Sequence, residues 1–301
     1  TGEPKIFNDE VAIPAGLGKG YSLEDARDYT VVGCVEIDAA GYEYGCHDAT
    51  YFNVSRVLEL AINDGKWLHD GVQMGIHTGY LKDMKSFDEV LEAFDKQMEY
   101  LVGLMISSVN TIEQVHKEYK PLPYLSLFIE DCVKNGRDVT AGGAKYNHSG
   151  PQALALGTAA DSLATIKQLV FDEKSITAEE LIDALKKNWE GYEKLYRLVN
   201  SDKVHHYGND DDYADELAKF VFDTYCKYVE HRPNVRGGEF APGVYSVAGN
   251  VPHGMVQWAS ADGRQAYEPV SDCIGAVHTH VASHDIKGPT AMLNSVAKLD
   301  H

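Results

Sequence analysis

A cysteine and a carboxylate stand two residues apart near the start of the chain, at Cys34 and Glu36. The apolar run at 31–32 predicts a short buried strand, and Gly33 lets the backbone turn sharply where that strand ends. Residues two apart in extended backbone point to the same side, so we expect the thiol and the carboxylate to lie side by side. Such a pair can react together at a strand end, although most buried cysteines are inert.

A second short motif, Gly-Cys-His-Asp at 45–48, follows closely. The thiol of Cys34 with a histidine base would be the arrangement of a conventional hydrolase. No oxyanion-hole motif accompanies it, and no Cys/His signature of a known hydrolase type is present. We therefore keep this reaction class only as a weaker alternative.

Three histidines between 278 and 284 have the density of a metal site. No cysteine or carboxylate with zinc-like spacing accompanies them apart from Asp285, so we expect a loop with surface imidazoles and no bound metal. The histidine pair at 205–206 is expected in a structural turn. The acidic run at 210–212 lacks the alternating ligand spacing of a calcium loop and is better explained as the acidic start of a helix.

The elements that must position these groups alternate between long helices and short apolar strands, which predicts an α/β class with active groups at strand ends. Ser22, Ser86 and Thr177 each precede an acidic residue by three positions, the pattern of a helix-capping box. No linker or repeat divides the chain, so we expect one domain over 1–301. The predicted helices lie near 48–65, 86–119, 124–133, 158–199, 210–230 and 289–299, the predicted strands near 29–34, 140–147 and 237–251, and 1–20 is expected to be mostly loop.

The composition is that of an ordinary globular protein, with 301 residues of which 44% are hydrophobic and 24% charged. A net charge of −19 disfavours nucleic acid, whose binding depends on Lys and Arg contacts to phosphates. No apolar run approaches the ~18 residues of a membrane span, and no signal peptide is recognised at Thr1. The five cysteines are scattered without a CxxC pair, which favours a reducing cytoplasm.

The order of several motifs resembles that of the glycyl radical enzymes of the pyruvate formate-lyase family. The motifs are Phe-Asn-Asp-Glu at 7–10, Ser-Leu-Glu-Asp-Ala-Arg-Asp at 22–28, Gly-Cys-Val-Glu at 33–36, Gly-Cys-His-Asp at 45–48, Gly-Gly-Ala-Lys-Tyr-Asn at 142–147, Tyr-Gly-Asn-Asp-Asp-Asp-Tyr at 207–213, Asp-Gly-Arg at 262–264, and Lys-Gly-Pro-Thr at 287–290 through Ser-Val-Ala-Lys-Leu at 295–299. Each is weak alone, but together they span essentially the whole chain. The glycerol- and diol-dehydratase-like branch looks closest.

That resemblance implies part of a ten-stranded α/β barrel, with helices outside and two loops that meet inside. One loop would carry the reactive cysteine, and the other a glycine that stores a backbone radical. Cys34 would become a thiyl radical that abstracts hydrogen from a substrate carbon, and Glu36 would act as general base on the neighbouring hydroxyl. His47 and Asp48 fall where the dehydratases place a pair that contacts the substrate and assists the departure of water.

Two tyrosines are candidate walls of the substrate pocket: Tyr51, just past the His-Asp pair, and Tyr245, on the late predicted strand. The alternative for each is an ordinary core aromatic. The resemblance further implies a glycyl radical on a segment outside this chain, installed by a radical-SAM activating enzyme, with no bound metal. The implied partners are the remaining portion of the enzyme, a small-molecule substrate and a second subunit in a homodimer, without nucleic acid or membrane.

The sequence departs from the dehydratase pattern at Ile37, where proline is usual, and at Cys46, which replaces a tryptophan. These changes reshape the loop above the substrate and leave the reaction open among dehydration, arylacetate decarboxylation and C–N or C–S cleavage. A radical segment of the type Arg-Val-x-Gly-Tyr is expected after the last helix, and its nearest match, 236–238, lacks the flanking pattern. We therefore expect either a C-terminal-half fragment of a longer enzyme or a chain whose other pieces are separate polypeptides. In both cases the chain alone would be catalytically silent, and a non-catalytic scaffold is the alternative.

Overall fold

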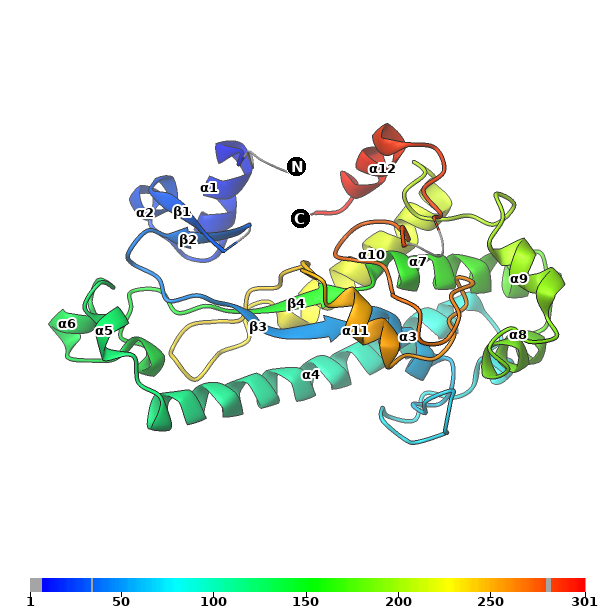
Figure 1. The fold of residues 1–301 in the computed structure, drawn as a ribbon, viewed down its shortest axis with the longest axis horizontal. Coiled ribbons are helices and arrows are strands. Elements are labelled where there is room, and N and C mark those ends of the chain that lie inside the picture. The colour runs from blue at the N-terminus through cyan, green and yellow to red at the C-terminus, as the bar shows by residue number, and fades with distance from the viewer. Residues whose placement is uncertain (1–6, 34, 280–282, 301) are drawn as a thin grey trace. The chain divides into compact units, whose positions relative to one another are not determined.

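The computed structural model describes residues 7–33, 35–279 and 283–300, and Figure 1 shows helices mixed with short strands. The strands are β1 (Tyr29–Val32), β2 (Glu36–Ala39), β3 (Cys46–Asn53) and β4 (Ser149–Leu154). The longer helices are α1 (Asp9–Gly18), α3 (Val54–Ala61), α4 (Phe87–Tyr119), α7 (Leu156–Thr165), α8 (Ala178–Lys186), α9 (Glu193–Val199), α10 (Asp212–Val229) and α12 (Pro289–Val296). Short helices are α2 (Leu23–Arg27), α5 (Pro123–Ser126), α6 (Cys132–Asn135), α11 (Asn250–Met255), the 3₁₀ turns η1 (Leu81–Asp83) and η2 (Val139–Ala141), and the π-helix η3 (Ile166–Asp172).

The contacts divide the chain into two compact units. The first contains the residues up to Thr50, Ile106–Pro151 and Val229–Gly243. The second contains Tyr51–Met105, Gln152–Tyr228 and the residues from Val244 onward. The single-domain organisation stays a prediction. Among the described residues, no helix is both long and apolar enough to cross a membrane.

In the first unit, β1 and β2 form an antiparallel hairpin, with Val32 opposite Glu36. This register leaves the three residues 33–35 as the hairpin loop. Helices α1 and α2 pack beside the hairpin, and a small core of Tyr21, Ala26 and Ala39 lies beneath it. Strands β3 and β4 form the second two-stranded sheet and lie side by side in Figure 1.

In the second unit, α7 is buried on every side, and α3 packs against it. A helix that is apolar or small all round belongs in a protein interior, and α7 carries mostly Leu, Ala, Gly, Ser and Thr. One acidic side chain, Asp161, is buried in the middle of this helix. A buried carboxylate needs polar or charged partners, and those of Asp161 include the imidazoles of His206 and His284.

Several predicted elements are confirmed, together with the caps that begin them. The Oγ atoms of Ser22 and Thr177 accept hydrogen bonds from the backbone three residues on, as a capping box requires. Helix α4 covers almost the whole predicted range, and α10 and α12 lie within theirs. The turn after α6 places Gly136 at a φ of +60°, where glycine is favoured.

Other predicted elements are wrong. Residues 9–18 form a helix, which Asn8 caps by accepting from the Glu10 N–H at 3.0 Å. The helix expected from about Asp48 is preceded by the strand β3 and begins only at Val54. The helix expected at 124–133 consists of two single turns, α5 and α6.

The strands expected at 140–147 and 237–251 are also wrong. The first region contains the 3₁₀ turn η2, and the second is irregular before α11. Another part of the backbone lies very close to the first region, because a Cβ at Gly142 would collide with the carbonyl oxygen of Arg236. The expected burial of the first strand is wrong too, since Val31 and Val32 are exposed.

Candidate functional site

The hairpin loop at 33–35 holds the position of the predicted reactive cysteine. Gly33 has a φ of +63°, a left-handed conformation that side chains disfavour. This residue reverses the chain between β1 and β2, as the sequence predicted for the end of the strand. Cys34 itself lies outside the described residues.

The carboxylate of Glu36 lies against both chain neighbours of position 34. Its Oε2 accepts a hydrogen bond from the Val35 N–H at 2.9 Å. A Cβ built on Gly33 would stand 2.9 Å from the same oxygen, closer than real contacts allow. The loop therefore holds the Glu36 carboxylate at its own tip, and the absence of a side chain at position 33 makes room for it.

His47 is held by a carboxylate that the sequence did not single out. Its Nε2 lies 2.5 Å from Oδ1 of Asp38, and both side chains are largely buried. Asp38 and Glu36 are two residues apart on β2, so they project from the same face of the hairpin. Gly45 lies directly beside this pair, where a Cβ would collide with the His47 ring. The geometry thus links the imidazole to the strand that carries Glu36.

His47 and Asp48 occupy adjacent positions of β3 and project from opposite faces of that strand. His47 is largely buried, whereas Asp48 is exposed. The two residues therefore do not form a side-by-side pair on one surface. Their joint role in releasing water stays a prediction.

A second buried pair of side chains, Glu43 and His148, lies next to β3. Glu43 Oε1 lies 2.7 Å from Nδ1 of His148, and the His148 carbonyl accepts from the Cys46 N–H at 2.9 Å. Burial acts to raise the pKa of Glu43, but the His148 hydrogen bond and the charge of Lys19 outweigh it and lower that pKa. Burial also raises the pKa of Cys46, so this thiol stays protonated at neutral pH.

The two predicted pocket tyrosines belong to the second unit. Tyr51 packs against the buried cluster of Leu154, Ala155 and Val270. Tyr245 is half-buried in an irregular segment, where a strand was expected. The turn that follows it approaches Tyr51, because a Cβ on Gly249 would lie 3.5 Å from the Tyr51 ring. These contacts are those of core aromatics, and a role in substrate binding stays a prediction.

Arg236, in the nearest match to a radical segment, is a buried structural residue. Its guanidinium pairs with Glu113 at 3.1 Å. It also donates to the carbonyls of Tyr44 and His148, both at 2.6 Å, and to Oγ of Ser149 at 3.1 Å. Such a fully engaged guanidinium joins three segments of the first unit.

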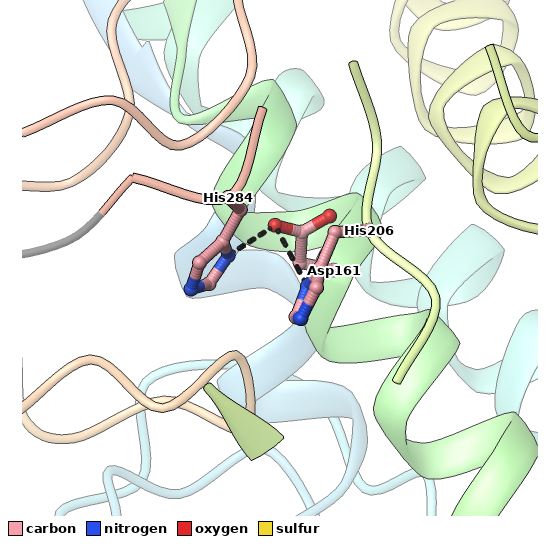
Figure 2. A group of neighbouring side chains, drawn as sticks. All are labelled: Asp161, His206 and His284. Atoms are coloured by element: carbon pink, nitrogen blue, oxygen red, sulfur yellow. Dashed lines mark hydrogen bonds and ion pairs between the residues drawn. The ribbon is translucent and has the colours of Figure 1, made fainter. Parts of the chain in front are cut away.

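Figure 2 shows a further polar cluster, formed by Asp161, His206 and His284 in the second unit. All three are buried, and each offers one ligand atom within 4.8 Å of the others. The expectation of surface imidazoles is therefore wrong for His284, which is 4% exposed, whereas His278 is exposed and paired with Asp285 at 2.9 Å.

Asp161 carries a lowered pKa of about 2: burial acts to raise it, and the two neighbouring imidazoles outweigh that effect. The same carboxylate raises the pKa of His284 against the opposing effect of burial. His206 and His284 belong to the histidine groups at 205–206 and 278–284 that the sequence singled out, but no local signal linked them to each other or to Asp161, since the three residues stand far apart in the chain.

A comparison with protein families matches the model described as "Pyruvate formate lyase-like" over residues 1–254. The chain is 57% identical to the (2S)-3-sulfopropanediol dehydratase of Klebsiella oxytoca, over all of this chain and 36% of that protein. It is 37% identical to the trans-4-hydroxy-L-proline dehydratase of Clostridioides difficile, over all of this chain and 37% of that protein.

Among solved structures, the glycerol-bound B12-independent glycerol dehydratase from Clostridium butyricum matches with a TM-score of 0.94 and 41% identity. That match covers all of this chain and 37% of the other, so the chain spans little more than a third of the relatives it matches. The likeness confirms the α/β class and its glycyl radical enzyme type. With the family model covering most of its length, the chain belongs to the pyruvate formate lyase-like family.

Proposed function

We propose that the complete protein containing this chain is a glycyl radical dehydratase that removes water from a small vicinal diol. The observation that carries the proposal is the 57% identity to a (2S)-3-sulfopropanediol dehydratase, which runs over the whole chain. The substrate class we favour is therefore a three-carbon diol, with an anionic group such as a sulfonate at its far end as the first compound to test.

Cys34 and Glu36 perform the first half of the reaction. As a thiyl radical, Cys34 takes a hydrogen atom from the carbon that bears one hydroxyl of the diol. A carbon radical makes its own hydroxyl far more acidic, so the Glu36 carboxylate accepts that proton. The geometry supports this assignment of roles, because the Val35 N–H binds the Glu36 carboxylate and Gly33 leaves room for it.

His47 and Asp48 perform the second half. The second hydroxyl of the diol leaves as water when His47 or Asp48 gives it a proton. Glu36 has gained one proton from the first hydroxyl, so the number of protons on the protein is unchanged. The remaining carbonyl radical takes the hydrogen atom back from Cys34, so the net change is diol to aldehyde plus water. Asp38 acts as a positioning residue, since its carboxylate holds the His47 ring at 2.5 Å.

The glycyl radical, carried on a segment outside this chain, supplies the unpaired electron that converts the Cys34 thiol to a thiyl radical. A radical-SAM activating enzyme installs it, and the enzyme works as a homodimer in an anaerobic cytoplasm. None of the described cysteines forms a disulfide, in agreement with a reducing compartment.

A second reaction class has its own support. The chain is 34% identical to the isethionate sulfite-lyase of Bilophila wadsworthia, so C–S cleavage is the alternative for the same Cys34 and Glu36 pair. Decarboxylation has weaker support, from 27% identity to an indoleacetate decarboxylase. A non-catalytic scaffold is the remaining alternative.

The test is anaerobic activation of the complete protein, followed by incubation with 3-sulfopropanediol, 1,2-propanediol, glycerol, trans-4-hydroxyproline and isethionate. We expect an aldehyde from a diol, detected by mass spectrometry. Cys34→Ala should abolish turnover while the glycyl radical doublet still forms in the EPR spectrum. Cys226→Ala, in α10, is the matched control and should keep both.

Sulfite release from isethionate without diol turnover would replace dehydration by C–S cleavage. A radical that forms without turnover of any substrate would favour the scaffold. Retained turnover in Cys34→Ala would rule this cysteine out as the radical carrier.

A further inference from the structure

We propose that Asp161, His206 and His284 form a binding site for a divalent transition metal ion, for which Zn²⁺ is the best fit (Figure 2). Two imidazoles with one carboxylate are a common protein ligand set for zinc. The three residues come from α7, from the segment before α10 and from the segment before α12. An ion bound there would join three parts of the second unit that are distant in sequence.

The geometry around Asp161 is close to that of a metal site. Its Oδ2 lies 2.7 Å from Nδ1 of His284 and 3.5 Å from Nδ1 of His206. Two ligands of a tetrahedral zinc ion, each about 2 Å from it, are about 3.3 Å apart. The observed separations lie on either side of this value, so small side-chain shifts admit an ion in place of the proton between Asp161 and His284.

A simple ion pair between Asp161 and His284 does not explain why the His206 ring is buried beside them. A protonated His284 would satisfy the Asp161 carboxylate alone. The His206 ring is 6% exposed, and neither of its nitrogens has a hydrogen-bond partner. Its separation of 3.5 Å from Asp161 is too long for a well-formed hydrogen bond. A buried imidazole without partners is costly, and a metal ion would supply the missing interaction.

Asp161 and His284 each make a further hydrogen bond through an atom other than the one that would bind the ion. Asp161 Oδ1 accepts from the Tyr207 N–H at 2.7 Å, which leaves Oδ2 for the imidazoles. His284 Nε2 faces Oδ1 of Asn200 at 3.4 Å, which leaves Nδ1 for the ion. Metal-binding histidines commonly donate their second ring N–H to such an oxygen, and metal-binding carboxylates are hydrogen-bonded in turn.

A cavity of ≈ 20 Å³ lies beside the cluster and is lined by His284 and Asp262, among others. It has room for one water molecule. Asp262 is buried, and its Oδ2 has no hydrogen-bond partner. A water molecule in this cavity can serve as the fourth ligand that zinc takes beside three protein ligands.

The test is metal binding by the complete protein after treatment with a chelator. Equilibrium dialysis with Zn²⁺ and elemental analysis should find one tightly bound ion per chain. Co²⁺ should give the visible absorption bands of a low-coordinate site with nitrogen ligands. Because bound metal stabilises the folded state by mass action, Zn²⁺ should also raise the Tm.

His206→Gln is the decisive variant, because its ring makes no hydrogen bond that the fold would lose. We expect Zn²⁺ affinity to fall by more than about 100-fold, since loss of even an outer-shell partner costs about 10–100-fold. The Co²⁺ bands and the metal-dependent rise in Tm should disappear, while the Tm without metal stays within a few degrees. His278→Gln, an exposed imidazole near His284 in the chain, is the matched control and should bind as the wild type does.

Two results would overturn the proposal. One is a wild-type protein that binds less than one ion per chain or gives no Co²⁺ bands. The other is a folded His206→Gln variant with unchanged affinity, which would assign the metal to another part of the molecule.

Discussion

At the scale of single residues, the predicted reactive groups are of two kinds. Some are positioned by residues of their own loop, and others are positioned by a residue on another strand. Glu36 is positioned by its own chain neighbours through the Val35 N–H. His47 depends on Asp38, a residue whose importance appears only when β2 and β3 are seen together. The orientation of the imidazole is therefore a tertiary property, although the imidazole is visible in the sequence.

Asp38→Asn should lower the kcat of the complete enzyme by about 10–100-fold, the usual effect of removing a group that orients a functional histidine. KM should change little, because the amide is close in size to the carboxylate and the substitution alters only how the His47 ring is held. Steady-state kinetics measure kcat and KM separately. The control is Asp28→Asn, an exposed position. Wild-type kinetics in Asp38→Asn would show that this contact plays no part in the reaction.

At the scale of elements, the β1–β2 hairpin presents the loop that is predicted to be reactive. Its register places residues 33–35 between the strands, and Gly33 supplies the left-handed turn. The same glycine leaves the space that the Glu36 carboxylate occupies. Gly33 is thus needed both for the left-handed backbone of the turn and for the space that the Glu36 carboxylate occupies.

Gly33→Ala should reduce turnover strongly, because the new methyl group must displace the Glu36 carboxylate. The left-handed φ adds a strain of about 1–2 kcal/mol. Gly41→Ala separates the two effects: Gly41 also has a positive φ, of +73°, but nothing lies within 4 Å of its Cβ position. Both variants should lose similar stability in urea denaturation, and only Gly33→Ala should lose activity. Equal activities in the two variants would contradict the steric argument.

At the scale of the whole molecule, buried charged groups connect segments that are far apart in the chain. Arg236 joins Glu113, Tyr44 and the segment at 148–149 within the first unit. The cluster of Asp161, His206 and His284 has the corresponding place in the second unit. Buried ions are expensive unless paired, so each network constrains where its segments lie.

Arg236→Ala should destabilise the protein by about 3–5 kcal/mol, because Glu113 would keep a buried charge without its oppositely charged partner. The double variant Glu113→Gln with Arg236→Met removes both charges and should recover part of that loss. Arg232→Ala, at an exposed position, should change the stability by less than about 0.5 kcal/mol. Urea denaturation measures all three, and a double variant less stable than Arg236→Ala would contradict the buried-charge explanation.

The elements predicted well from sequence are those whose signals are local. Helix caps at Ser22 and Thr177 depend on a side chain and a backbone group three residues apart, and the apolar period of α4 extends over a long window. The glycine punctuation of 140–147 and the alternating apolar residues of 237–251 are local patterns that predict strands. In the fold, their backbones instead approach other segments closely: a Cβ at Gly238 would collide with the carbonyl oxygen of Asn147.

By itself, the sequence determined the family, the order of its motifs and the hairpin turn beside Cys34 and Glu36, because each depends on residues close together in the chain. Only the tertiary structure decided that Asp38 holds His47, that Arg236 is structural, and that Asp161, His206 and His284 meet. These contacts join positions between nine and nearly two hundred residues apart. No local pattern encodes them, since burial and chain folding alone bring such side chains within bonding distance.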